Sequence, residues 1–216
     1  MIKVEFHCHT CYSKDSLVKI PDLLAASKKK GLDRLVITDH NNIQGALEAI
    51  TLDPYRFIIG EEIMTQQGEL LCVFVKEHIP AGLPALETID ILRTQGAFIS
   101  VSHPFDALRK GHWDENDLLD ILPRIDAIEV FNSRCMDPQF NKHAVNFAKQ
   151  HNLVGTVGSD SHSLGEVGTA SLTLPDFDDT ASLKHALQLA HQNIRLSPPW
   201  VHFYSRYAAW RKKNKA

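Results

Sequence analysis

Histidine is the most unusual residue of this chain, with 12 copies in 216 residues against 3 tryptophans and 4 tyrosines. His7 and His9 flank Cys8, so on an extended strand both imidazoles point to the same face. Asp160 and His162 repeat this period-two spacing near the other end of the chain. Mixed imidazole and carboxylate ligands suit Zn²⁺, Mn²⁺ or Fe²⁺ better than Ca²⁺. The two pairs therefore indicate a metal site.

Further ionisable side chains follow apolar segments in the same manner. The residues at these segment ends are Asp39 and His40, Glu61 and Glu62, and His103, while Asp15 lies in the loop after His9. Burying this many ionisable groups together without a cation would cost several kcal/mol in repulsion and desolvation. Divalent cations offset that cost, so we expect Asp15, His40, Glu62 and His103 to meet around metal ions. Asp39 would orient His40 by a hydrogen bond, and Glu61 would lie either behind the ligands or facing solvent.

The elements that must position these residues are short strands alternating with helices. The predicted strands are 2–9, 34–40, 56–63, 70–75, 97–103, 126–132 and 152–160. The predicted helices are 21–31, 42–50, 84–95, 115–122, 138–151 and 180–192. This alternation predicts an α/β fold with a mostly parallel sheet, either open or closed as a barrel. The carboxyl ends of such strands meet at one mouth, where the candidate ligands would gather.

The composition is that of a folded globular domain, with 44% hydrophobic and 23% charged residues. No apolar run approaches the ~20 residues of a membrane span, and the first residues do not resemble a signal peptide, so we expect a cytoplasmic protein that does not contact membranes. Four cysteines in this context do not suggest a disulfide framework. A net charge of −3 gives no general attraction to a polyanion. The oligomeric state is left open.

We expect one main domain over residues 1–196 and a tail over residues 197–216 packed on the same domain. The tail follows Ser197-Pro198-Pro199 and is rich in aromatic and basic residues, which are Trp200, Phe203, Tyr204, Tyr207, Trp210, Arg211, Lys212 and Lys213. We expect its aromatic face to dock on the body and its basic end to be solvated.

The order of five motifs, HCHTCYSKDS, ITDHNNIQGALEA, GEEI, SHPFD and GSDSH, resembles the PHP (polymerase and histidinol phosphatase) superfamily of metal-dependent phosphoesterases. The resemblance covers roughly residues 3–175. It implies a distorted (βα)₇ barrel that holds two or three divalent ions, Mn²⁺, Zn²⁺ or Fe²⁺, at the carboxyl ends of its strands. It also implies hydrolysis of phosphoesters of small molecules or of nucleic acids.

The resemblance assigns the ligands in three groups. It implies that the first metal lies among His7, His9, Glu62 and Asp160. Glu62 would bridge to a second metal that also uses His103, and a third would lie among Asp15, His40 and His162. Many relatives have a histidine shortly after the bridging glutamate, where this chain reads GELLCVF. We expect Glu69 to serve there instead, with His78 as a weaker substitute.

The substrate would be held by residues near the same mouth. Asn132 and Arg134 end the sixth predicted strand and Arg109 follows the SHPFD motif, where they could bind phosphate oxygens or be ordinary surface residues. Arginine suits the first role because its planar fork matches phosphate geometry. Two metals could bridge a hydroxide that attacks phosphorus, with Glu62, Asp160 and His103 as the catalytic residues, so no side-chain nucleophile is needed.

Four functions are compatible with these residues. The first is a metal-dependent phosphoesterase acting on a small phosphorylated metabolite or nucleotide. A 5′-3′ exonuclease on short single-stranded nucleic acid would use the same chemistry. A non-catalytic, metal-stabilised PHP module is disfavoured by the nearly full ligand set. An amidohydrolase that cleaves a C–N bond with similar metals is disfavoured by the candidate phosphate-binding arginines.

Overall fold

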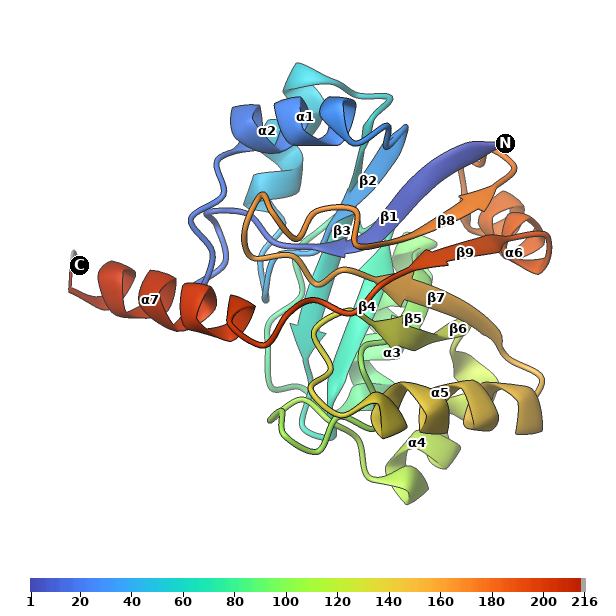
Figure 1. Ribbon diagram of the computed structural model, residues 1–216. Coiled ribbons are helices and arrows are strands. Elements are labelled where there is room, and N and C mark those ends of the chain that lie inside the picture. The colour runs from blue at the N-terminus through green and yellow to red at the C-terminus, as the bar shows by residue number, and fades with distance from the viewer. Residues whose placement is uncertain (215–216) are drawn as a thin grey trace.

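One curled sheet of nine strands forms the centre of the molecule, in the order β7-β6-β5-β4-β3-β2-β1-β8-β9 (Figure 1). The computed structural model describes residues 1–214. The strands are β1 (Ile2–Cys8), β2 (Arg34–Ile37), β3 (Phe57–Met64), β4 (Glu69–Val73), β5 (Phe98–Val101), β6 (Ala127–Asn132), β7 (Val154–Gly158), β8 (Ala170–Leu174) and β9 (His191–Ile194). β2 and β5 are buried along their whole length, and apart from Arg34 and Ser100 their residues are apolar.

The sheet curls until its two halves almost meet, giving a nearly closed, barrel-like shape. Cys8, at the end of β1, pairs in parallel with Ser161, just beyond β7. The backbone N–H of His9 donates to the carbonyl of Ser161 at 2.9 Å. The two period-two motifs, about 150 residues apart in sequence, are therefore neighbours in space.

Helices surround the sheet, and Figure 1 shows α1 and α2 on one side of it and α4 and α5 on another. The helices are α1 (Ile20–Lys29), α2 (Gln44–Leu52), α3 (Ala85–Gln95), α4 (Glu115–Ile121), α5 (Pro138–Gln150), α6 (Thr180–Gln188) and α7 (Val201–Lys213). Residues that favour helix ends lie where they should in α1, because Pro21 is in its first turn and Lys28 and Lys29 are in its last. Among residues 1–214, the helices are all too short or too polar to cross a bilayer.

The α/β class and a barrel-like sheet are confirmed, but the expected distorted (βα)₇ repeat and mostly parallel sheet are not, since four of the eight strand pairs within residues 1–214 are antiparallel. β4 runs antiparallel to both β3 and β5. Only residues 65–68 connect β3 to β4, and a parallel return needs a crossover of roughly a dozen residues, so β4 must turn back.

The end of the chain also differs from the prediction. β8 and β9 were not predicted, and both pair antiparallel at the edge beyond β1. The helix predicted over residues 180–192 stops at Gln188, and β9 follows it. All four residues of β9 are exposed, so this edge strand lacks the apolar alternation by which a strand is recognised.

The tail forms α7, which projects from the body in Figure 1. The predicted docking of its aromatic face is wrong, because five aromatic side chains of the tail are 51–69% exposed: Trp200, Phe203, Tyr204, Tyr207 and Trp210. Val201 and Ala208 are buried in their place. Small residues therefore face the body and large ones face solvent. Residues 215–216 of the predicted tail lie outside the described residues.

Candidate metal centre

The ends of six strands and the loops after them place all nine predicted ligands at one mouth of the barrel. His7 lies on β1, Glu62 on β3 and Glu69 at the first residue of β4. The remaining six follow strand ends and are His9, Asp15, His40, His103, Asp160 and His162. His103 and Asp160 both have positive φ angles, of 23° and 52°. Non-glycine residues rarely adopt this conformation, and it is enriched where function constrains the backbone.

The first predicted group converges tightly. The Nε2 atoms of His7 and His9 are 3.1 Å apart. Glu62 Oε1 lies 3.3 Å from His7 Nε2, and Asp160 Oδ1 lies 3.2 Å from His9 Nε2. All four side chains are buried. Two imidazole nitrogens and two carboxylate oxygens thus surround one small volume, which is the geometry that a cation with mixed ligands requires.

The second group meets the Glu62 carboxylate at the same oxygen as His7. His103 Nε2 is 3.1 Å from Glu62 Oε1 and 3.4 Å from Glu69 Oε2. Glu69 therefore lies beside His103, as expected for the second group. Gly111 packs directly on its carboxylate, so that a Cβ at position 111 would overlap Glu69 Oε2. By contrast, His78 pairs with Glu61 at 2.7 Å, and neither of these two residues lines the mouth.

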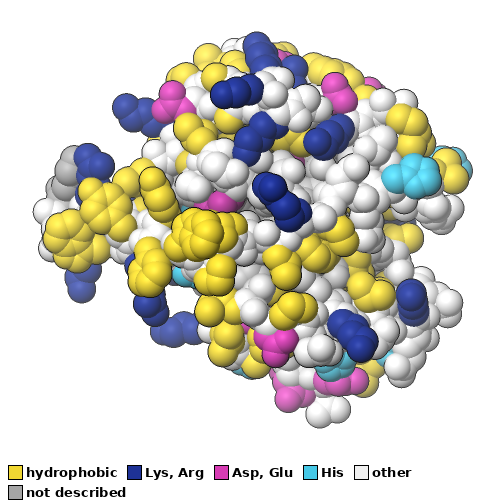
Figure 2. Space-filling model, viewed as in Figure 1, with side chains coloured by type: hydrophobic (Ala, Val, Ile, Leu, Met, Phe, Trp, Pro, Cys, Tyr) yellow, Lys and Arg dark blue, Asp and Glu magenta, His cyan; other side chains and the backbone are white. Residues whose placement is uncertain are grey.

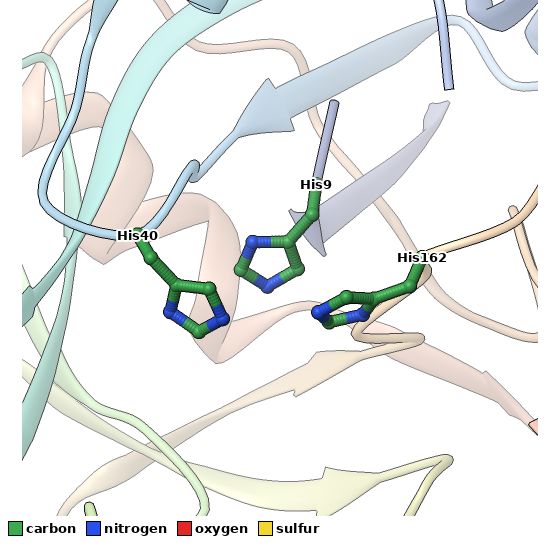
Figure 3. A group of neighbouring side chains, drawn as sticks. All are labelled: His9, His40 and His162. Atoms are coloured by element: carbon green, nitrogen blue, oxygen red, sulfur yellow. The ribbon is translucent and has the colours of Figure 1, made fainter. Parts of the chain in front are cut away.

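The third group, Asp15, His40 and His162, meets His9 of the first group at the mouth, and Figure 3 shows the rings of His9, His40 and His162 facing a common centre. The ring of His9 lies 4.4 Å from that of His40 and 4.3 Å from that of His162, centroid to centroid. Asp15 completes the group, with carboxylate oxygens 3.6 Å from His40 Nε2 and 3.4 Å from His162 Nε2.

The protonation states of three candidate ligands, Glu62, Asp160 and His9, suit metal binding. Burial alone would raise the pKa of Glu62, but His7 and His40 outweigh burial and hold that pKa well below its usual range. Burial is likewise outweighed at Asp160, by Arg109 and His7, so its pKa is also lowered. Burial and the neighbouring His162 and His40 lower the pKa of His9 to about 3. Glu62 and Asp160 are therefore ionised and His9 is neutral. Burial instead raises the pKa of Glu69, while at His7 and His40 burial is outweighed by Glu62 and other carboxylates, which raise the pKa of both imidazoles.

Unpartnered polar atoms provide a direct test of whether a cation fits. Among the described residues, three buried carboxylate oxygens at this mouth have no hydrogen-bond partner, and they are Asp15 Oδ1, Glu62 Oε2 and Asp160 Oδ1. Buried polar atoms are nearly always satisfied in folded proteins. Glu62 and Asp160 belong to the first predicted group and Asp15 to the third. The donor set thus fits divalent metal ions.

Sequence reasoning missed the residues that orient these ligands. Glu129, on β6, accepts from His7 Nδ1 at 2.9 Å and from the backbone N–H of His103 at 2.8 Å. A carboxylate behind an imidazole fixes which nitrogen faces the metal. The available signal was a lone acid inside the apolar run AIEVF. Ser102 also donates to Glu62 Oε1 at 2.6 Å.

The three predicted substrate-binding residues take different positions. Arg109 Nη1 is 2.5 Å from Asp160 Oδ2, and its Nε donates to Asp106 at 3.0 Å. Asn132 is buried and accepts from Arg109 Nη2 at 3.3 Å. Arg134 is also buried. Its Nη2 donates to Ser205 Oγ of α7 at 2.8 Å. Phosphate binding by these residues stays a prediction.

The metal centre opens into a cavity of about 800 Å³. Asp15, His40, Glu69, Arg109 and His162 form part of its lining. The cavity is also lined by three exposed basic residues, Lys14, Lys110 and Arg206. A molecule of nucleotide size can therefore reach the predicted ligands from solvent.

Comparison with known proteins places the chain in a family. The family model described as PHP domain matches residues 5–119, and the model described as PHP-associated matches residues 138–189. The uncharacterized protein MJ0417 of Methanocaldococcus jannaschii is 34% identical over 195 residues, which are 87% of this chain and 78% of that protein. The chain therefore belongs to the PHP family.

Solved structures share the fold at low sequence identity. One is described as a "putative metal-dependent phosphoesterase" from Bifidobacterium adolescentis, with a TM-score of 0.64, 18% identity, and coverage of 86% of this chain and 95% of that one. Another is the lesion-specific endonuclease PfuEndoQ of Pyrococcus furiosus, with a TM-score of 0.60, 15% identity, and coverage of 92% and 59%. These likenesses concern the fold.

Proposed function

We propose that this PHP-family chain is a metal-dependent phosphoesterase that hydrolyses a small phosphorylated metabolite or nucleotide. The observation that carries the proposal is the position of the buried Glu62 carboxylate, within 3.5 Å of His7, His9 and His103. One carboxylate shared by two groups of ligands is the arrangement of a two-metal hydrolytic site.

The residues around Glu62 would hold the ions in the groups described above. Divalent cations bound there would act as Lewis acids, lowering the pKa of an attacking water and neutralising charge on the phosphate. Glu129 keeps the Nδ1 proton of His7 engaged, so that Nε2 faces Glu62 and Asp160. Arg109, which Asp106 and Asp160 hold at the cavity wall, would bind phosphate oxygens.

Two features favour this function over its competitors. A structural metal site is normally closed, whereas four of these ligands, Asp15, His40, Glu69 and His162, line a cavity of about 800 Å³, which favours catalysis over a non-catalytic module. The basic residues Lys14, Arg109, Lys110 and Arg206 line that cavity. They favour an anionic phosphoester over the neutral amide of an amidohydrolase substrate. A short nucleic-acid strand with a terminal phosphate would meet the same residues and is the second candidate.

A substrate panel tests the proposal. The protein is assayed with Mn²⁺, with and without a chelator, on nucleoside bisphosphates, sugar phosphates, histidinol phosphate and 5′-phosphorylated oligonucleotides. We expect phosphate release that the chelator abolishes. Glu62→Ala and Asp160→Ala should each lower kcat by at least ~10³-fold, while His185→Ala, on the exposed face of α6, should leave it unchanged. Full activity in both site variants would place the chemistry elsewhere.

A further inference from the structure

One wall of the metal-site cavity is formed by α7, a helix that lies outside the regions matched by the family models. Phe203 lines the cavity together with His40, Glu69 and His162 and is 69% exposed. Figure 2 shows hydrophobic side chains gathered over α7, with basic side chains beside them. A phenyl ring exposed at the opening of a charged site is an apolar surface that the hydrolytic chemistry does not require.

Both ends of α7 are fixed to loops that carry site residues. Near its start, Arg134 donates to Ser205 Oγ at 2.8 Å, and His202 Nε2 lies 3.1 Å from the carbonyl oxygen of Arg134. Near its end, Lys212 Nζ donates to the carbonyl of Cys11 at 2.6 Å and also contacts the carbonyl of Ser13. The helix is thus held between the loop after β6 and the loop that contains Asp15. Phe203 is therefore positioned in advance of ligand binding.

The charge of this wall indicates the chemistry of its occupant. Residues 201–213 include four lysines and arginines and no carboxylate. Arg206 lies one helical turn after Phe203 and lines the same cavity, as do Lys14 and Lys110. None of these three basic residues forms an ion pair within residues 1–214. An anion is therefore favoured over a second copy of this basic helix, because two such helices would repel each other.

Phe203 further restricts the choice of anion. Its ring offers no hydrogen bond, so it gains most from a flat ring that can stack on it, and nucleobases stack on aromatic side chains regardless of base identity. The exposed Leu108 and Met136 line the same cavity and add apolar surface. A sugar phosphate without a base would leave this surface in water.

We propose that Phe203 and Arg206 form a base-stacking subsite, so that the substrate of the metal centre is a nucleoside phosphate. The base would lie on Phe203, and Arg206 would contact the sugar-phosphate portion or a second phosphate. The ligand can be a free nucleotide or the terminal nucleotide of a short strand. This inference rests on the proposed phosphoesterase function for its catalytic consequence, but base binding itself can be measured separately.

The test compares a phosphoester that has a base with one that lacks it. KM is measured with Mn²⁺-loaded protein for AMP, ribose 5-phosphate and a 5′-phosphorylated adenine dinucleotide. We expect Phe203→Ala to raise the KM for AMP about 10-fold or more, to leave ribose 5-phosphate within about 2-fold, and to be rescued by Phe203→Trp. Trp210→Ala is the matched control, because Trp210 is equally exposed on α7 but does not line this cavity.

A second readout does not depend on turnover. Saturation-transfer NMR with adenosine should show contact with the adenine protons in the native protein and a large loss of signal in Phe203→Ala. Equal effects of that variant on AMP and ribose 5-phosphate, with unchanged adenosine signals, would overturn the inference while leaving the phosphoesterase intact. Phe203-dependent adenosine binding without any phosphate release would instead reject the proposed function and support the subsite. A KM effect seen only with the dinucleotide would identify a strand end as the ligand.

Discussion

Glu129 contacts the candidate metal ligands although it is not one of the predicted ligands itself. Its two oxygens accept from His7, the His103 backbone and Asn132, at 2.9, 2.8 and 3.0 Å. One buried carboxylate thereby orients a ligand from the first group and a ligand from the second. Gly158 makes room for this contact, since a Cβ there would overlap both Glu129 and His7.

Replacing Glu129 by glutamine should weaken metal binding without unfolding the protein. The neutral amide no longer stabilises the Nδ1 proton of His7, so the ligand nitrogen is less basic and less well oriented. Losses of such orienting residues typically cost about 10- to 100-fold in metal affinity or activity. Equilibrium dialysis against Mn²⁺ measures the change, with Glu77→Gln, on an exposed loop, as the control. Equal affinity of the two variants would remove Glu129 from the site.

At the scale of elements, Asp126 ties three parts of the fold together at the start of β6. It accepts from Arg93 on α3 at 2.6 Å, from Lys184 on α6 at 2.9 Å and from the backbone of Ile99 on β5 at 2.9 Å. Burial raises the pKa of Asp126, but the bonds from Arg93 and Lys184 outweigh it and leave that pKa below its ordinary value.

The Asp126→Asn variant should therefore be less stable in a pH-dependent way. Because the folded-state pKa is depressed, the ionised group adds stability above the unfolded pKa of about 3.9, and that stability disappears as the pH falls through the folded value. Both basic partners are partly exposed, so we expect only about 1–2 kcal/mol at pH 7. Urea unfolding at pH 7 and pH 3 measures it, with Asp90→Asn, from an exposed pair with Arg124, as control. A pH-independent difference would contradict this account.

The elements also show what could be predicted from the sequence. Candidate ligands such as His7 and Asp160 were predictable because they lie at the ends of strands whose apolar composition predicts that they are buried. The reversal of β4 was predictable in principle, from the four residues that join it to β3. The exposed β9 was not, because an edge strand outside the core is held by backbone pairing and leaves no apolar pattern. Glu129 was missed because its role depends on contacts 122 residues away.

At the scale of the whole molecule, charge is arranged locally. The chain carries a net charge of −3, while the cavity and α7 carry a local group of basic residues that includes Lys14, Lys110 and Arg206. A ligand that meets only a few of them releases few counterions, so affinity should fall slowly with salt. This distribution favours a mononucleotide or short strand over a long duplex.

Charge reversal at the end of α7 tests this arrangement. Arg211→Glu with Lys213→Glu removes basic charge from the solvent-facing end, while Lys212 is kept because it anchors the helix to Cys11. We expect unchanged kcat/KM for AMP and only a weak dependence on NaCl concentration for both proteins. A selective loss of activity on long nucleic acid would show that the end of α7 binds polynucleotides, and the exonuclease would become the favoured function.

The predicted ligands should form a centre for more than one metal ion, and metal stoichiometry tests this expectation most directly. Protein purified without chelators, supplemented with Mn²⁺, Zn²⁺ or Fe²⁺ and freed of excess metal, is analysed by inductively coupled plasma mass spectrometry. The nine converging ligands predict two or three ions per chain, falling by at least one in Glu62→Ala. A content below one ion per chain with every metal would contradict the account.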